Sequence, residues 1–206
     1  MSTFLNILAG AVALAATMMP ASAQTLASLP QATTPAVASG EARPILAWVE
    51  FCRRLPSECA VNTSEPEVIA LTPRTWTTIT SVGRKVNALV KPMTDEAHWG
   101  LADKWDIPED GSGDCEDIQL LKRKLLVEAG LPRRAMRMTV VLDDKNEGHA
   151  VLTIRTDRGD FVLDNKTDAV LPWFQTGYIF VKRESPNAVA WVSLGGAVSP
   201  TATANR

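Results

Sequence analysis

The sequence predicts an α+β fold, in which helices come first and an antiparallel sheet follows. Two observations lead to this prediction. Before residue 130, apolar residues recur at spacings of three and four, as they do along amphipathic helices. After residue 135, five short segments read as strands, and turn-forming residues separate the first three of them. The helical half and the strand half do not alternate, which distinguishes this pattern from that of a parallel α/β fold.

Three helices are expected in the first half of the chain. One lies within residues 44–60, ahead of a turn flanked by two cysteines. The second begins after Thr72, a capping residue, with Pro73 at its first position. Its predicted buried face consists of Trp76, Ile79, Val82, Val86 and Leu89. The third begins near residue 115 and ends at Gly130 and Pro132. Its predicted buried residues are Ile118, Leu121, Leu125 and Ala129, and its predicted outer residues are Lys122, Arg123 and Lys124.

The second half of the chain predicts a sheet of short strands. We expect strands at residues 136–142, 149–156, 160–164, 178–182 and 188–192. Residues 143–148 and 157–159 have the composition of hairpin turns. Between the helical segments, residues 91–113 have no regular pattern but contain Trp99 and Trp105, which we expect to pack in the core.

The N-terminal region predicts export. Residues 1–40 contain no charged side chain, and an apolar run at residues 7–16 precedes a small-x-small site at residues 21–23. The run is too short to span a bilayer, although a basic residue before it, usual in a signal peptide, is missing. We therefore expect a signal peptide at residues 1–23, a disordered linker at 24–44, the folded domain at 45–196 and a flexible tail at 197–206. The protein is expected in the periplasm or outside the cell.

Charge and cysteine content narrow the function classes. The net charge of -2 gives no reason to expect nucleic acid as a partner. In an oxidising compartment two of the three cysteines tend to pair. Cys52 and Cys59 lie close together around Pro56, so a disulfide between them is expected. A metal pair is the weaker alternative, because neither of the two histidines lies near them. Cys115 is left over.

The stretch GSGDCED places Cys115 at a helix start among three carboxylates. A helix N-terminus lowers a thiol pKa, and the free backbone N–H of the first turn can stabilise an oxyanion. The negative charge of the three carboxylates raises the thiol pKa instead. Two explanations of them remain open: helix capping with surface charge, or ligands for a hard cation such as calcium. The residues concerned are Asp114, Glu116 and Asp117.

A nucleophilic cysteine needs a base and a residue that orients it. His149 begins a predicted strand, and a hairpin returns the chain to Asp164 close to that strand's start. An Asp–His pair across the hairpin would fix the imidazole tautomer and leave the other ring nitrogen for Cys115. Taken singly, His149 and Asp164 are more simply residues that flank turns. Taken together, in this order along the chain, they favour a catalytic triad.

The runs GDCEDIQLLKRKLLVEAG and GHAVLTIRTDRGDFVLDNKTDAVLPW resemble bacterial transglutaminase-like cysteine peptidases, of the LapG-related periplasmic group. GYIFVKRES, WVSL and VNALVKPMTDEAHWGLADKW extend the resemblance over residues 41–196. It implies a papain-like or transglutaminase-like α+β fold, with a nucleophile helix packed on an antiparallel sheet. In this resemblance Cys115 matches the nucleophile, His149 the base and Asp164 the residue that orients it.

The resemblance also implies further properties. Calcium is expected at Asp114, Glu116 and Asp117, where it would cancel their charge. A protein substrate at the cell surface or in the periplasm and an inner-membrane regulator are expected as partners. We therefore expect a hydrolase, an exported cysteine peptidase that acts through a thioester acyl-enzyme. The same triad also serves acyl transfer to an amine, as in a transglutaminase or amidase, and a catalytically silent binding module could keep the fold.

Overall fold

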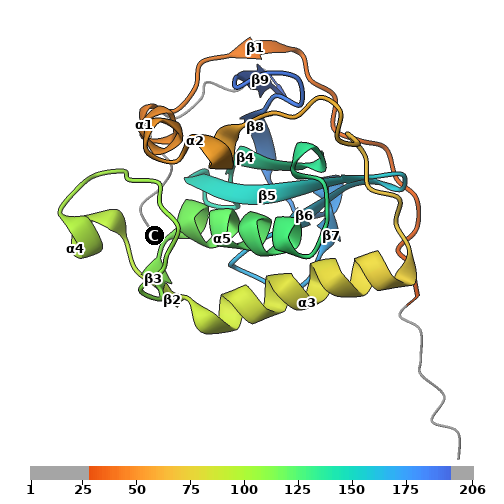
Figure 1. Cartoon of the computed structure of the whole chain (residues 1–206), viewed down its shortest axis with the longest axis horizontal. Coiled ribbons are helices and arrows are strands. Elements are labelled where there is room, and N and C mark those ends of the chain that lie inside the picture. The colour runs from red at the N-terminus through yellow and green to blue at the C-terminus, as the bar shows by residue number, and fades with distance from the viewer. Residues whose placement is uncertain (1–27, 196–206) are drawn as a thin grey trace, which may run out of the picture.

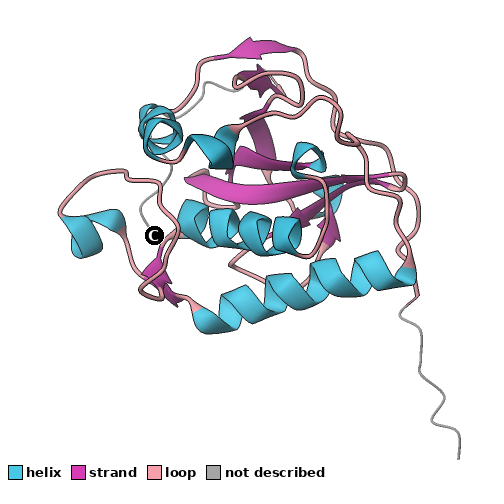
Figure 2. Cartoon of the chain, viewed as in Figure 1, coloured by secondary structure: helices cyan, strands magenta, loops and turns pink. Residues whose placement is uncertain are grey.

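A seven-stranded antiparallel sheet with helices packed against it forms the centre of the molecule (Figures 1 and 2). The computed structural model describes residues 28–195, so the predicted signal peptide and C-terminal tail lie outside the described residues. The strand order is β1-β9-β8-β4-β5-β6-β7. The strands are β1 (Gly40–Ala42), β4 (Met136–Leu142), β5 (Gly148–Thr156), β6 (Gly159–Leu163), β7 (Leu171–Pro172), β8 (Ile179–Glu184) and β9 (Trp191–Ser193).

The helical half begins with α1 (Leu46–Arg54) and α2 (Pro56–Cys59), which the disulfide Cys52–Cys59 joins as predicted. It continues with α3 (Pro73–Leu89), α4 (Asp95–Trp99) and α5 (Cys115–Glu128). A short parallel pair, β2 (Lys91–Pro92) and β3 (Ser112–Gly113), closes the loop that contains α4. Two 3-10 turns, η1 (Arg133–Ala135) and η2 (Trp173–Gln175), follow later in the chain. The α+β class is confirmed.

The sheet separates two apolar clusters, as the alternation of its strands requires. Leu152 and Ile154 of β5 belong to the main core, which the helices cover. Val151 belongs to a smaller cluster on the opposite face with Val141, Val162 and Phe180. Helix α5 packs against β5, and α3 packs against α5 (Figure 1). This layering places the first residue of α5 beside the first residues of β5.

Helix α3 has the predicted start but a shifted buried face. Thr72 and Thr75 form a capping box, in which each hydroxyl accepts the other residue's backbone N–H. The buried residues of the helix are Ile79, Gly83 and Val86. The prediction that Leu89 is buried was wrong, since it is 62% exposed and Val90 takes the core position after the helix ends.

Helix α5 differs most from its predicted pattern. Lys122 and Arg123 were expected on the outer side but are buried, whereas Ala129 is exposed. The reason is that the sheet, α2 and α3 enclose this helix from several sides, so polar side chains must also enter the interior. Both buried cations have protein acceptors there.

Two strands near the C-terminus lie slightly later than predicted. Strand β8 runs two residues past the expected end at Lys182, and β9 begins at Trp191 instead of residue 188. Ala188 to Ala190 form the exposed turn between them, closed by a bond from Ser185 N to Ala190 O. The apolar residues Ala188 to Ala190, which were predicted to begin a strand, belong to this turn.

The tryptophans of the irregular region have different environments. Trp105 is fully buried, as predicted. Trp99 is 44% exposed, so its predicted core position was wrong. It stacks on His98 and lies under the Lys104 amine at the surface.

The predicted linker is ordered where the structure describes it. Residues 28–44 lie along the sheet, and β1 pairs with β9. Thr33 N donates to Arg158 O at 2.8 Å, and the buried Ala36 donates its N–H to an Asp160 carboxylate oxygen at 3.0 Å. The expectation of disorder was wrong for this segment because its backbone groups find partners on the sheet. Of the helices in residues 28–195, none has the length and apolar character needed to cross a membrane.

Candidate active site

Cys115 is the first residue of α5 and forms no disulfide bond within the described chain. The β2–β3 pair fixes the segment before it, through a bond from Met93 N to Gly113 O at 3.0 Å. Gly113 is required here because a Cβ would lie 2.8 Å from the Asp117 side chain. The cysteine is only 3% exposed, and Ala150 N, in β5, donates to its Sγ at 3.4 Å. The start of α5 therefore meets the start of β5.

His149, next to Ala150 in β5, is paired with Asp164. Its Nε2 lies 2.8 Å from Asp164 Oδ1, and both side chains are buried. The register of β5 with β6 explains this contact. Leu152 pairs with Leu163, the last residue of β6, so Asp164, which follows it, lies close to the beginning of β5. The expected geometry of an Asp–His pair across the hairpin is present, beside the strand residue that contacts Cys115.

Asp164 is held at both carboxylate oxygens and at its carbonyl. Tyr178 OH donates to Oδ2 at 2.6 Å, and Lys166 N donates to Oδ1 at 3.0 Å. The carbonyl accepts from Lys122 Nζ at 2.8 Å and from Asn87 Nδ2 at 3.0 Å. Burial alone would raise the pKa of Asp164, but the bonds from His149, Tyr178 and Lys166 outweigh it and lower the pKa to about 2. Asp164 is therefore a carboxylate at neutral pH.

The thiol itself lies in a surrounding that disfavours ionisation. Burial raises the pKa of Cys115 well above its ordinary value, and Glu116 and Asp114 raise it further by charge repulsion. The N–H of Ala150 acts in the other direction. Glu116 Oε2 accepts from the thiol at 3.2 Å. An activated thiolate here needs a positive charge to offset the carboxylates.

The three carboxylates around Cys115 are buried, which excludes the surface-charge explanation. Asp114 occupies the N-cap position of α5, yet its side chain accepts no capping bond. The structure also brings two acidic residues from the α4 region to this cluster. Oxygens of Asp95, Asp114 and Asp117 lie within 4.8 Å of one another, as do oxygens of Asp95, Asp103 and Glu116.

Several oxygens of this cluster lack a hydrogen-bond donor among the described residues. They are both carboxylate oxygens of Asp114, Asp95 Oδ1 and Glu116 Oε1. Burial, followed by mutual repulsion, raises the pKa of Asp114 to about 7 and that of Asp117 to about 8. Buried carboxylate oxygens that repel one another and receive no hydrogen bond are suitable ligands for a hard divalent cation. The residues present therefore fit calcium.

Comparison with known families gives a match over residues 38–198, to the family described as bacterial transglutaminase-like cysteine proteinase BTLCP. This match covers most of the chain. The chain belongs to this family. It is thus placed among the transglutaminase-like cysteine peptidases. No curated protein sequence matches it.

Solved structures similar to this family member include those of Legionella pneumophila LapG. The calcium-bound form shares 23% identity at a TM-score of 0.51, covering 63% of this chain and 74% of that one. A second structure of this LapG shares 26% identity at a TM-score of 0.47, covering 53% of this chain and 64% of that one. This chain thus spans slightly less than two thirds of the second structure's length and 74% of the calcium-bound one. The likeness to the calcium-bound form supports the papain-like α+β fold.

The sequence pattern did not point to several residues that the structure places at the candidate site of this protein. Tyr178, Asn87 and Lys122 all contact Asp164, and Asp95 and Asp103 join the acidic cluster. Of these five residues, only Lys122 has a spacing that relates it to Cys115, since it lies seven residues later on the same helix. No spacing in the sequence connects the other four to the cysteine. The one available signal was composition: Tyr178 is the only tyrosine of the chain.

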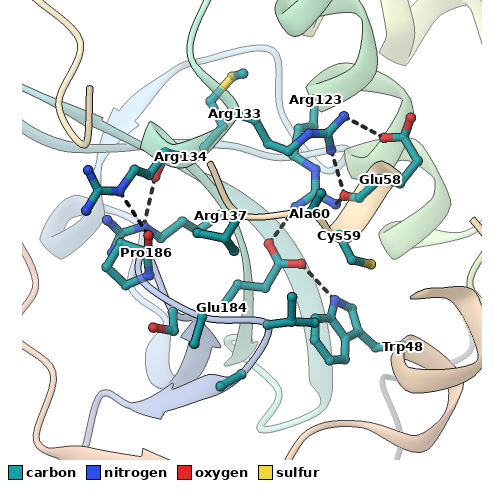
Figure 3. A pocket seen from close by; sticks show the side chains of 16 residues that line it. Trp48, Glu58, Cys59, Ala60, Arg123, Arg133, Arg134, Arg137, Glu184 and Pro186 are labelled. Carbon is teal, nitrogen blue, oxygen red and sulfur yellow. Dashed lines mark hydrogen bonds and ion pairs between the residues drawn. The ribbon is translucent and has the colours of Figure 1, made fainter. Parts of the chain in front are cut away.

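A small pocket at the other end of α5 is a weaker candidate site (Figure 3). Its volume is about 30 Å³, enough for one or two water molecules. Its guanidinium groups already donate to protein acceptors: Arg123 and Arg133 to Glu58, Arg134 to Pro186. Their arrangement is that of an internal network that joins α2 and α5 to β8.

Proposed function

We propose that this family member is an exported cysteine peptidase that cleaves a protein substrate through a Cys115–His149–Asp164 triad. One observation carries the proposal: the N–H beside His149 contacts the Cys115 thiol, while His149 itself is bonded to a buried carboxylate. Cys115 and the proposed Asp–His pair thus come from segments that are in contact. The position of Cys115 at a helix N-terminus, which lowers a thiol pKa, also supports the proposal.

In the proposed reaction, His149 takes the thiol proton and the Cys115 sulfur attacks the peptide carbonyl. The backbone N–H of Cys115, in the first turn of α5, is the proposed donor to the oxyanion. The amine leaves with the proton from His149, and a thioester remains. Water then attacks the thioester, gives a proton to His149, and releases the acid and the thiol. Asp164 binds Nε2 throughout and leaves Nδ1 as the nitrogen that exchanges protons with Cys115.

The acidic cluster is the proposed calcium site. Its ligands are drawn from Asp114, Glu116, Asp117, Asp95 and Asp103. A bound calcium ion would supply positive charge that offsets the carboxylates raising the thiol pKa. It would also fix the α4 region to the start of α5, because Asp95 and Asp103 belong to the α4 region and the other three ligands to the start of α5.

Alkylation of Cys115 tests the triad without knowledge of the substrate. The other two cysteines form a disulfide, so iodoacetamide reports on Cys115. With calcium present near pH 7, we expect rapid labelling of the wild type and labelling at least about 10-fold slower for His149→Ala. Cys115→Ala should take up no label. Equal slow labelling of wild type and His149→Ala would refute the activated thiol and favour a binding module.

Asp95→Asn tests the calcium site. Removing one ligand charge is expected to weaken calcium binding about 10-fold or more in isothermal titration calorimetry. Glu96→Gln, the exposed neighbour in α4, loses the same charge outside the cluster and should bind calcium like the wild type. Equal affinities of both variants would place the ion elsewhere.

Export, and partners at the cell surface or inner membrane, are proposals from the N-terminal sequence and the family. N-terminal sequencing of protein from a periplasmic fraction should give a chain that begins at Gln24. A substrate would then be found among surface or periplasmic proteins that become shorter only when Cys115 is intact. Recovery of the full-length chain from the cytoplasm alone would contradict the assignment.

A further inference from the structure

Lys122 is a buried amine that the proposed reaction does not use. It lies seven residues after Cys115 on α5, close to two turns, so both side chains leave the helix on the same face. Its exposure is 0%, and its Nζ donates to the carbonyl oxygen of Asp164 at 2.8 Å. One helix therefore contacts both ends of the proposed triad, through the nucleophile and through the residue that orients the base.

Two further side chains hold the same segment. Asn87 of α3 donates through Nδ2 to the Asp164 carbonyl at 3.0 Å and to Asp168 Oδ1 at 2.9 Å. Gln119, between Cys115 and Lys122 on α5, is buried and donates to Asn165 Oδ1 at 3.4 Å. The loop after β6 is thus fixed to the nucleophile helix and to its neighbour α3.

Stability does not explain a lysine at this position. Burial lowers the pKa of Lys122 to about 7, which reflects the cost of desolvating its charge, and Asp164 and Asp168 oppose the shift only in part. An apolar side chain of similar length avoids that cost. The Asp164 carbonyl would keep its bond from Asn87, so no acceptor would be left without a donor. The position of Lys122 is better explained by its contact with the Asp164 carbonyl and its place on the helix of Cys115 than by a gain in folding free energy.

We propose that Lys122 is a positioning residue of the peptidase reaction, which ties Asp164 to the helix of Cys115 and so sets the orientation of His149 toward the thiol. This inference rests on the proposed triad. The tie holds for both protonation states of the lysine, because an ammonium and an amine both donate an N–H. Misplacement of a catalytic group by about 1 Å can cost a factor of about 100 in rate, so a rigid link of this kind is chemically significant.

Lys122→Met tests the proposal through the labelling rate of Cys115 in the full chain with calcium. We expect iodoacetamide labelling to slow about 10-fold, while the melting temperature stays equal or rises. Destabilisation alone would act in the opposite direction, since local opening exposes the buried thiol and speeds labelling. The sign of the change thus separates positioning from structural damage.

Leu126→Ala is the matched control. Leu126 is fully buried one turn after Lys122 and packs in the main core. This variant should lower the melting temperature without slowing the labelling. Asn87→Ala is the second variant, at a half-buried position, and should slow labelling in the same direction as Lys122→Met but by less.

The outcomes separate the two proposals. Slow labelling of His149→Ala, with labelling of Lys122→Met and Asn87→Ala at the wild-type rate, would overturn the role of Lys122 and leave the triad intact. Wild-type labelling in His149→Ala would overturn the triad itself. Slower labelling in Lys122→Met but not in Leu126→Ala would support the positioning role.

Discussion

Asp164 shows how surroundings determine the ionisation of one residue. Desolvation acts on its carboxylate to raise the pKa, yet bonds from His149, Tyr178 and Lys166 more than compensate. The result is a pKa of about 2, below the ordinary value of 3.8. A carboxylate with a lowered pKa stabilises the fold above its unfolded pKa and loses that contribution as the pH falls through its folded pKa.

Tyr178→Phe should therefore destabilise the protein in a pH-dependent way. The substitution removes the hydroxyl that donates to Asp164 Oδ2 and keeps the ring that packs edge-on against His149. We expect a loss of about 1.5–3 kcal/mol in unfolding free energy near pH 7, because a bond to a charged group is lost. The loss should shrink as the pH falls from about 4 toward 2.

Urea denaturation of wild type and Tyr178→Phe, followed by tryptophan fluorescence at several pH values, measures this difference. Val189→Ala, at an exposed turn position, serves as a control and should show a small difference that does not change with pH. A Tyr178→Phe difference that is constant across the acidic range would mean that the hydroxyl does not act on the ionised form of Asp164.

Helix α5 shows the same principle at the scale of an element. Its polar residues face inward because neighbouring elements supply acceptors. Arg123 donates to Glu184 of β8, which also accepts from Trp48 Nε1 at 2.7 Å (Figure 3). The same carboxylate accepts from Met138 N at 2.9 Å. One carboxylate thus joins α1, α5, β4 and β8. The link holds α5 at its C-terminal half, while Lys122 and Cys115 hold it near the site.

Arg123→Leu should be strongly destabilising. It leaves the carboxylate of Glu184 buried without its cation, for which we expect a loss of about 3–5 kcal/mol in unfolding free energy. Urea denaturation measures the loss. Lys124→Ala, the next residue on the helix, is the control: its distant ion pair with Glu109 is exposed, and the expected change is below about 1 kcal/mol.

The double variant Arg123→Leu/Glu184→Gln completes this experiment. Glutamine removes the charge but keeps an acceptor oxygen for the buried N–H groups of Trp48 and Met138. Removing both charges together should cost less than the single Arg123 substitution, because no unpaired buried charge remains. If the two effects simply add, the ion pair is not the source of the loss.

For the whole molecule, the extended segment before α1 acts as a strap across the sheet. Ala36 donates its N–H to Asp160, and its carbonyl accepts from Arg183 at 2.9 Å. Gly159 sits in the turn below the strap with φ +100, and a side chain there would collide with Thr33. The strap lies after the predicted cleavage site, so cleavage at that site would leave it in the chain.

A shortened chain that begins at Gly40 should be less stable. It loses the backbone partners of two buried charged groups, and we expect about 3 kcal/mol lower unfolding free energy by urea denaturation. Val37→Ala in the full chain, at a position that is 78% exposed, should change it by less than about 0.5 kcal/mol. Equal stability of the shortened chain would mean that the strap only covers the sheet.

The sequence by itself determined the local features. The periodicity of apolar residues predicted the positions of α3, α5 and the hairpins, because the helical and strand repeats depend only on residues close together in the sequence. The pairing of His149 with Asp164 followed from the hairpin, since a tight turn fixes the register. The Cys52–Cys59 disulfide followed from short spacing in the same way.

Only the tertiary structure decided which side chains from distant segments meet. The sequence predicts Lys122 on the outer side of its helix, but in the structure α3 and the loop after β6 enclose it. Tyr178, Asp95 and Asp103 reach the site across long loops. The linker gained order in the same way, through partners on a sheet formed much later in the chain. The pattern of side chains along the sequence predicts local secondary structure. Burial and charge pairing depend on how helices and strands pack together, which the local pattern does not contain.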